Sequence, residues 1–236
     1  MPISLANSSV LVIGASSGMG RETALQFARE GANVTAVARR LEKLQEIESE
    51  VALISSGDAT DPASMEHVAA VATQKFGGVD IMIYATGDNT PDRSMARMTP
   101  DIWDHMIQVN LSGAYYATRA VLPGMRDRKA GLLVYVSSRS AVSPDESGAS
   151  YQAAKRGLLG FSNAVRVEEK DNGIRTCVIC PGLTDTELIL KRPVKTPEAT
   201  VAKALQSEDV AELIVAICRL PARTWVPEVH LFPAML

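Results

Sequence analysis

The chain has few cysteines, no long apolar run and no excess of positive charge, and each shortage excludes a class of protein. Three cysteines in 236 residues cannot build a disulfide framework. The longest apolar runs are of strand length, which is too short to cross a bilayer. A net charge of −3 provides no basic field for nucleic acid, and no run of lysines or arginines suggests a membrane surface.

What remains is the composition of an ordinary soluble globular protein, with 46% hydrophobic and 22% charged residues. The first residues, MPISLANSSV, lack a charged region followed by an apolar core and a cleavage site, so no secretory signal is predicted. We therefore expect a cytoplasmic protein that fits one α/β domain.

Two of the cysteines, Cys177 and Cys180, form the motif CVIC, for which a redox or metal-binding pair is one interpretation. The surrounding run TCVIC favours a buried strand, on which residues three apart point to opposite faces. We interpret both as core residues. The histidines His67, His105 and His230 are far apart and without ligand spacing, so we interpret them as structural or surface residues and predict no metal site.

Short apolar runs alternate with segments of helical spacing along the whole chain. The predicted strands are 8–14, 33–38, 51–56, 79–85, 131–138 and 174–180, with a possible edge strand at 226–232. The predicted helices are 21–31, 41–50, 62–76, 100–122, 150–171 and 208–219, the last capped by Ser207. Apolar strands separated by helices predict a Rossmann-type, doubly wound parallel sheet with helices on both faces. Ligands of such sheets bind beyond the carboxyl ends of the strands.

The first strand runs into a glycine-rich turn of spacing GxxxGxG, followed by a helix. Glycines allow the backbone to approach a pyrophosphate, whose charge suits the amides of a helix N-terminus. A purely structural turn is the alternative. The residues predicted to contact the cofactor here are Gly14, Ser16, Ser17, Gly18, Met19 and Gly20.

The end of the second strand discriminates between the two nicotinamide dinucleotides. It reads Arg39-Arg40, with no acidic residue before Glu42. An arginine suits the 2′-phosphate of NADP(H), whereas an acid would bind the ribose 2′-hydroxyl of NAD. Ser16 could add a hydroxyl to the same phosphate. NADP(H) is therefore the predicted cofactor, unless both arginines are solvated surface charges.

Tyr151 and Lys155 are four residues apart in a predicted helix and would share one of its faces. A lysine ammonium one turn away, together with the positive nicotinamide of an oxidised cofactor, would lower the pKa of the phenol. Tyr151 could then exchange a proton with a carbonyl or alcohol oxygen. The alternative is a pair on the solvent-facing side of the helix.

These motifs, in this order, resemble the short-chain dehydrogenase/reductase family in its compact form. The resemblance rests on the glycine turn, Asp58, Asn110, Ser138 lying 13 residues before Tyr151, the Tyr151/Lys155 pair and Pro181-Gly182. It implies a single Rossmann domain, residues 1–236, with a dinucleotide-binding half at about 8–90 and a catalytic and substrate half at about 91–236. It also implies an NADP(H)-dependent carbonyl reductase or alcohol dehydrogenase acting on a small carbonyl or hydroxy compound.

The resemblance implies a role for each matching residue. Lys155 would hold the nicotinamide ribose, Asn110 would position a water, and Ser138 would hydrogen bond to the substrate oxygen. Further cofactor contacts would come from Asp58, Ala59, Ala85, Gly87, Pro181, Gly182, Thr184 and Thr186. A homodimer or homotetramer formed through helices 100–122 and 150–171 is also implied. A catalytically weak NADPH-binding sensor or scaffold is the alternative function.

The match to the family is imperfect at two cofactor positions. Ile13 stands where the family usually has threonine, and Tyr84-Ala85-Thr86-Gly87 stands where it usually has Asn-Asn-Ala-Gly. We expect weaker cofactor binding unless other groups compensate. The loop 183–197 carries Lys191, Arg192 and Lys195, which fits either recognition of an anionic substrate or a solvated flexible lid.

Overall fold

The computed structural model describes residues 2–236 and is built on one sheet of seven parallel strands. The strand order is β3-β2-β1-β4-β5-β6-β7. The strands are β1 (Ser9–Ile13), β2 (Asn33–Ala38), β3 (Leu53–Ser56), β4 (Ile81–Tyr84), β5 (Gly131–Val136), β6 (Ile174–Pro181) and β7 (Glu228–Leu231). The predicted doubly wound parallel sheet is confirmed, and the segment 226–232 does supply an edge strand.

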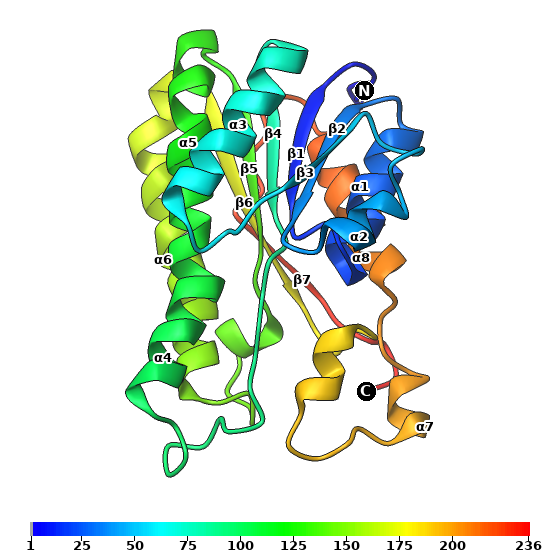
Figure 1. Ribbon diagram of the computed structural model, residues 1–236, viewed down its shortest axis with the longest axis vertical. Helices are drawn as coiled ribbons and strands as arrows, with labels where there is room; N and C mark the ends of the chain where they lie inside the picture. Colours follow the sequence, from blue (N-terminus) through cyan, green and yellow to red (C-terminus); the bar gives the residue numbers. More distant parts are fainter. Residues whose placement is uncertain (1) are drawn as a thin grey trace.

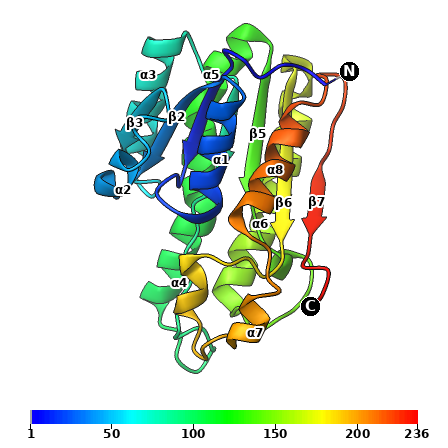
Figure 2. The same ribbon diagram turned by 90° about the vertical axis from the view of Figure 1, so that its right-hand side faces the viewer.

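Helices cover both faces of the sheet (Figure 1). They are α1 (Gly18–Arg29), α2 (Leu41–Gln45), α3 (Pro62–Phe76), α4 (Pro100–Ile107), α5 (Gly113–Arg128), α6 (Ala149–Glu169), α7 (Glu198–Val201) and α8 (Ser207–Cys218). Figure 2 shows α1 and α8 on one face, with α3, α5 and α6 on the other. Within residues 2–236, no helix combines the length and the apolar character needed to cross a bilayer.

The two apolar cores follow from the alternation of side chains along each strand. In β1, Val10 and Val12 pack against α1 and α8, whereas Leu11 and Ile13 pack against α3 and α5. In β6, Cys177 and Cys180 are buried in opposite cores, as the spacing of the CVIC motif predicts. All three cysteines are free thiols.

The order of strands reverses direction at β1, and this reversal locates the ligand crevice. The chain runs outward from β1 through β2 to β3, and then crosses back to place β4 on the other side of β1. Helices diverge at such a switch point, which leaves a crevice at the carboxyl ends of β1 and β4. The glycine turn that follows β1 and the Ala85–Gly87 segment that follows β4 lie there.

The helix predicted at 100–122 differs from the observed one in two ways. A π-turn, Gln108–Ser112, separates α4 from α5, and α5 continues past Pro123 to Arg128. Proline removes one helical hydrogen bond, but burial of Val121 and Met125 against the sheet offsets that loss. The predicted helix 41–50 is shorter, because only Leu41–Gln45 are helical. Gln206, rather than Ser207, is the N-cap of α8.

Candidate active site

The turn after β1 requires glycine for steric reasons. Gly14 has a φ of +97° and Gly18 a φ of +55°, both in the left-handed region that favours glycine. A Cβ on Gly20 would lie 2.2 Å from the carbonyl oxygen of Gly14. Because α1 begins at Gly18, its unpaired N–H groups lie at this turn, where they suit a phosphate.

A cationic cluster lies beside the glycine turn. Arg40 donates hydrogen bonds from Nη2 to Ser17 Oγ at 2.8 Å and to Ser16 Oγ at 3.1 Å, and from Nη1 to Glu187 at 3.0 Å. Arg39 is exposed at the same edge and acts on Asp58 by its charge. The predicted pairing of an arginine with Ser16 is therefore present, but through Arg40. The acceptor Glu187 was not predicted.

The segment after β3 holds an ionised carboxylate. Asp58 accepts hydrogen bonds from the backbone N–H and the hydroxyl of Thr60, at 2.9 and 2.8 Å. Its own N–H donates to Ser64 Oγ at 2.9 Å. Burial alone would raise the pKa of Asp58, but the Thr60 hydrogen bonds and the charge of Arg39 hold it below its usual value. Asp58 therefore stays negative at neutral pH.

Tyr151 and Lys155 lie on the inward face of α6, so the alternative of a solvent-facing pair is wrong. Their exposed fractions are only 7% and 3%. Lys155 Nζ lies 5.7 Å from the centre of the Tyr151 ring and donates to the carbonyl oxygen of Val136 at 3.0 Å. The Ser137 hydroxyl donates to the Lys155 carbonyl oxygen at 2.7 Å, which ties this part of α6 to the end of β5.

The lowering of the Tyr151 pKa by Lys155 and an oxidised cofactor stays a prediction, and the protein groups alone act in the opposite direction. Burial raises the pKa of Tyr151 to about 12, against the smaller opposing effect of a hydrogen bond with Ser138. Burial also lowers the pKa of Lys155 to about 8, so its ammonium is itself poorly stabilised. Desolvation therefore dominates both groups, and the phenol is protonated at neutral pH.

Ser138 begins the 3-10 turn Arg139–Ala141 that follows β5. Its Oγ donates to Ser140 Oγ at 3.1 Å and accepts from the Ser140 N–H at 3.2 Å. Ser140 in turn donates to Asp145 at 2.6 Å. This chain of hydrogen bonds orients the Ser138 hydroxyl, which interacts with the Tyr151 phenol.

Asn110 is fully buried in the π-turn between α4 and α5. Its Oδ1 accepts from the Asp88 N–H at 3.1 Å, and its Nδ2 donates to the carbonyl oxygens of Asp88 and Met106, both at 3.0 Å. A Cβ on Gly87 would lie 3.2 Å from Lys155 Nζ and 3.3 Å from Asn110 Oδ1. Gly87 therefore allows Asn110 and Lys155 to approach each other, and π-turns of this kind are frequent at functional sites.

At the Tyr84–Gly87 departure from the family pattern, the Tyr84 side chain makes a buried hydrogen bond. Tyr84 is fully buried, and its hydroxyl donates to the carbonyl oxygen of Val109 in the π-turn at 2.7 Å. This bond fixes the end of β4 against the helix that carries Asn110. A side chain at Gly113 would be impossible beside it, because a Cβ there would lie 2.2 Å from the Tyr84 oxygen.

The loop 183–197, for which recognition of an anionic substrate and a flexible lid were both open, is joined to residues of the cavity lining by two ion pairs. Glu187 and Lys191, the ends of a 3-10 turn, pair with Arg40 and Asp88 respectively. Asp88 also contacts His105 at 3.0 Å. Burial would raise the pKa of Asp88, but Lys191 and His105 hold it below its usual value. The signal for Asp88 in the sequence was an acid in the loop that follows the β4 strand, four residues after its last residue Tyr84.

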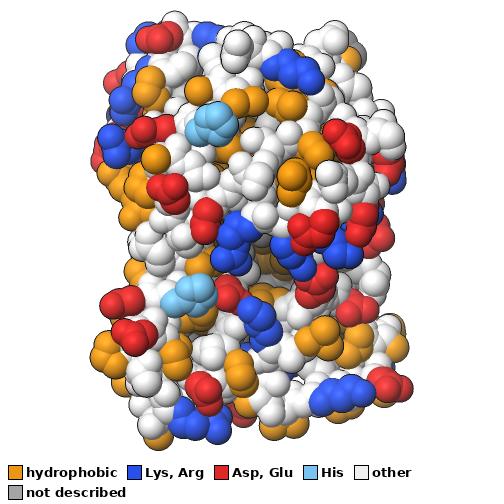
Figure 3. Space-filling model, in the orientation of Figure 1, with side chains coloured by type: hydrophobic (Ala, Val, Ile, Leu, Met, Phe, Trp, Pro, Cys, Tyr) orange, Lys and Arg blue, Asp and Glu red, His pale blue; other side chains and the backbone are white. Residues whose placement is uncertain are grey.

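A cavity of about 360 Å³ joins most of these groups. Figure 3 shows the hollow on the face of Figure 1, rimmed by charged side chains of both signs. The predicted residues that line it are Gly14, Ser16, Ser17, Gly18, Met19, Gly20, Arg39, Arg40, Asp58, Ala59, Ala85, Gly87, Tyr151, Lys155 and Thr186. Those placed outside its lining are Asn110, Ser138, Pro181, Gly182 and Thr184. Lining residues that were not predicted are Gly57, Thr60, Thr86, Asp88, Val109, Val136, Ser137, Glu187, Leu188 and Lys191, with Ile13 and Ala38 on the strand ends.

Four of the five residues outside the lining support it from behind. Pro181 ends β6, and the Gly182 N–H donates to Leu231 on β7 at 2.8 Å. Thr184 forms an isolated bridge with Leu205. Asn110 lies directly behind Gly87.

A profile of the family described as short chain dehydrogenase matches residues 8–195. An uncharacterized oxidoreductase of Staphylococcus aureus strain MRSA252 is 29% identical over 97% of this chain and 98% of its own length. A 3-oxoacyl-[acyl-carrier-protein] reductase of Thermotoga maritima is 30% identical over 87% of each chain.

Two solved structures show the same fold. The closed form of a serine dehydrogenase complexed with NADP+ superposes with a TM-score of 0.88, at 29% identity, over 96% of this chain and 95% of that one. A metagenomic short-chain oxidoreductase in complex with NADP gives a TM-score of 0.84, at 25% identity, over 98% and 99%.

Proposed function

Because the chain belongs to the short-chain dehydrogenase family and is an oxidoreductase of that family, we propose that it is NADP(H)-dependent and acts on a small carbonyl or hydroxy compound. The observation that carries this proposal is one cavity with a buried tyrosine and lysine at one end and two arginines at the other. The first pair suits proton transfer, and the second suits a phosphate.

The residues fit a dinucleotide along the length of the cavity. Gly14 and Gly20 leave no room for a Cβ, which would meet neighbouring backbone atoms, and at Gly87 it would crowd Lys155 and Asn110, so the chain packs closely around this cavity. Arg39 and Arg40 provide the positive charge expected for a 2′-phosphate. When bound, NADPH would supply the hydride. The protein would orient the cofactor and transfer the proton.

Tyr151 is proposed as the general acid for carbonyl reduction. Its phenol is protonated at neutral pH, because burial raises its pKa to about 12. The O–H proton can therefore be given to a carbonyl oxygen as negative charge develops there. The Ser138 hydroxyl would turn its single proton away from Ser140 Oγ and donate a second hydrogen bond to that oxygen. In the reverse direction, Tyr151 accepts the alcohol proton, which requires the phenolate.

Lys155 is proposed to act on both the cofactor and Tyr151. Its Nζ is buried between the Val136 carbonyl oxygen and the space beside Gly87, so its remaining donors face the cavity. There it would hold the nicotinamide ribose. Its charge would also stabilise the phenolate that forms when Tyr151 gives up its proton.

We predict that the chain binds NADPH at least about tenfold more tightly than NADH, because hydrogen bonds to a charged group are strong. Arg40→Ala and Arg39→Ala are each expected to weaken NADPH binding by about tenfold and to leave NADH binding nearly unchanged. Side-by-side fluorescence titrations measure both affinities. Arg119→Ala, an exposed arginine on α5, is the control. Equal binding of NADPH and NADH would assign both arginines to the solvated surface.

Glu187 is expected to oppose binding of NADPH, because its carboxylate occupies Arg40 and would repel a 2′-phosphate. The pair is half-exposed and hence weak. Glu187→Gln should therefore tighten NADPH binding by about two- to fivefold, with no change for NADH. The control is Glu198→Gln, an exposed acid further along the same loop region. Weaker NADPH binding in Glu187→Gln would show that this carboxylate instead helps to hold the cofactor.

A further inference from the structure

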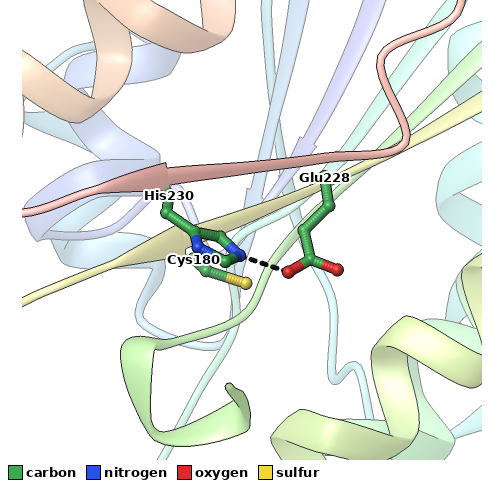
Figure 4. Close-up of side chains that lie close together, drawn as sticks. All are labelled: Cys180, Glu228 and His230. Carbon is green, nitrogen blue, oxygen red and sulfur yellow. Dashed lines mark hydrogen bonds and ion pairs between the residues drawn. The ribbon is translucent and has the colours of Figure 1, made fainter. Parts of the chain in front are cut away.

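Three potential metal ligands lie close together at one edge of the sheet, on the neighbouring strands β6 and β7. Cys180 on β6 is the register partner of His230 on β7. Glu228 precedes His230 by two residues and therefore points to the same face of β7. Figure 4 shows the three side chains directed toward one another.

The ligand atoms of Cys180, Glu228 and His230 all lie within 4.8 Å of one another. His230 Nε2 already contacts a Glu228 carboxylate oxygen. Among residues 2–236, this is the one group of three such side chains with that spacing. It lies outside the lining of the cofactor cavity.

The three ligands match the preferences of one class of cation. Thiolate and imidazole bind Zn²⁺ and related borderline metals, whereas Mg²⁺ and Ca²⁺ require oxygen ligands. A thiolate and a carboxylate together carry two negative charges, which neutralise a divalent ion. Three protein ligands leave the fourth tetrahedral position for water.

We propose that Cys180, Glu228 and His230 form a binding site for a thiophilic divalent cation of the Zn²⁺ class. On binding, the Cys180 S–H bond breaks and its proton leaves to solvent, while a metal–sulfur bond forms. His230 gives up its contact with Glu228 so that both can coordinate. No electron is transferred.

The surroundings of Cys180 support a metal–thiolate bond. The Cys180 side chain is fully buried, which limits competition by bulk water for its sulfur. Binding requires the thiolate form of Cys180, so the S–H proton must leave. A metal ion supplies the charge that removes this proton, and binding is therefore expected to tighten as pH rises.

The bound ion would link three segments. It would tie the edge strand β7 to β6 by side chains as well as by backbone hydrogen bonds. Cys180 also follows Ile179, whose carbonyl oxygen accepts a hydrogen bond at 2.7 Å from the N–H of Ser137, the residue before the Ser138 turn. The site is thus structurally adjacent to the reacting residues, although its ligands take no part in proton transfer.

Titration of the tag-free, chelator-treated chain with Co²⁺ tests the proposal, because tetrahedral thiolate–Co²⁺ bonds give an intense near-ultraviolet charge-transfer band. We expect the band to saturate at one Co²⁺ per chain, to release protons, and to disappear on addition of Zn²⁺. Cys180→Ser is expected to abolish it. His230→Ala and Glu228→Gln should each weaken binding by at least about tenfold, since loss of even an outer partner costs about 10- to 100-fold.

The controls separate this site from other residues of the same kinds. His67→Ala removes an exposed histidine on α3, and Cys218→Ala removes a buried cysteine on α8. Both should keep the full band. Because Cys180 is buried and its replacement could disturb folding, His230→Ala and Glu228→Gln carry the test independently. No band in the wild-type chain, or a band unchanged in these two variants, would overturn the proposal.

Discussion

Tyr151→Phe is expected to lower kcat for NADPH-dependent carbonyl reduction by about 10²- to 10⁴-fold, the usual contribution of a positioned general acid. Phenylalanine keeps the ring that fills this buried position and removes only the hydroxyl. The affinity for NADPH should therefore change by less than about threefold, or less than about 1 kcal/mol. Steady-state kinetics and a fluorescence titration of the same preparation give the two numbers.

Tyr115→Phe provides the matched control for the loss of a phenol. Tyr115 is half-exposed on α5 and does not line the cavity, so its variant should keep wild-type kcat. If Tyr151→Phe kept most of the wild-type rate, Tyr151 would not be the proton donor. If it lost NADPH binding as well as rate, the hydroxyl would have a role in holding the cofactor that we do not assign to it.

Lys155→Met is expected to lower kcat by at least about 10²-fold and, in the cofactor-free chain, to raise stability. The buried ammonium has its pKa lowered from 10.5 to about 8, a difference equivalent to about 3 kcal/mol of destabilisation at neutral pH. Methionine removes that cost and fills a similar volume. It also leaves the Val136 carbonyl oxygen without its donor, which costs about 1 kcal/mol. The net expected gain is about 2 kcal/mol.

The gain should depend on pH in a defined direction. Between about pH 8 and pH 10.5 the unfolded chain holds a proton on Lys155 that the folded chain has lost. The free energy of unfolding of the wild-type chain therefore rises with pH across that range. The stability that Lys155→Met gains over the wild-type chain decreases by the same amount. Urea denaturation at about pH 7 and about pH 10 measures this, with the exposed Lys203→Met as control. An advantage that grows with pH would contradict the burial of a charged lysine.

Much of the site could be predicted from the sequence because its geometry is local. Gly14, Gly18 and Gly20 lie where β1 passes into α1, and the positive φ values of Gly14 and Gly18 and the close contact of Gly20 with Gly14 follow from that sharp turn. Tyr151 and Lys155 share a helix face, so four-residue spacing was sufficient to bring them together. The two faces occupied by Cys177 and Cys180 followed from strand alternation in the same way.

Contacts between distant segments could not be predicted. Glu187 pairs with Arg40, which is 147 residues away in the sequence, and Lys191 pairs with Asp88, which is 103 residues away. Whether Arg39 or Arg40 contacts Ser16 depends on the directions in which the two neighbouring side chains point. The sequence does not give these directions, and in the structure it is Arg40 that contacts Ser16. The direction of the Tyr151 pKa depended on its burial in the folded chain, which the helical spacing does not reveal.

The same limit applies to the sheet edge. His230 was interpreted as a structural or surface residue because the three histidines are far apart in the sequence and show no ligand spacing. Only the parallel pairing of β6 with β7 places it opposite Cys180.

The measurement that tests the proposed function most directly is transfer of deuterium from NADPH labelled at the nicotinamide C4 position. The wild-type chain would be incubated with labelled NADPH and a panel of small aldehydes and ketones, and the products examined by mass spectrometry. We predict an alcohol that carries one deuterium on its carbinol carbon, with NADPH consumed in equal amount. Tight NADPH binding without a labelled alcohol from any member of the panel would contradict a carbonyl reductase and favour a cofactor-binding sensor.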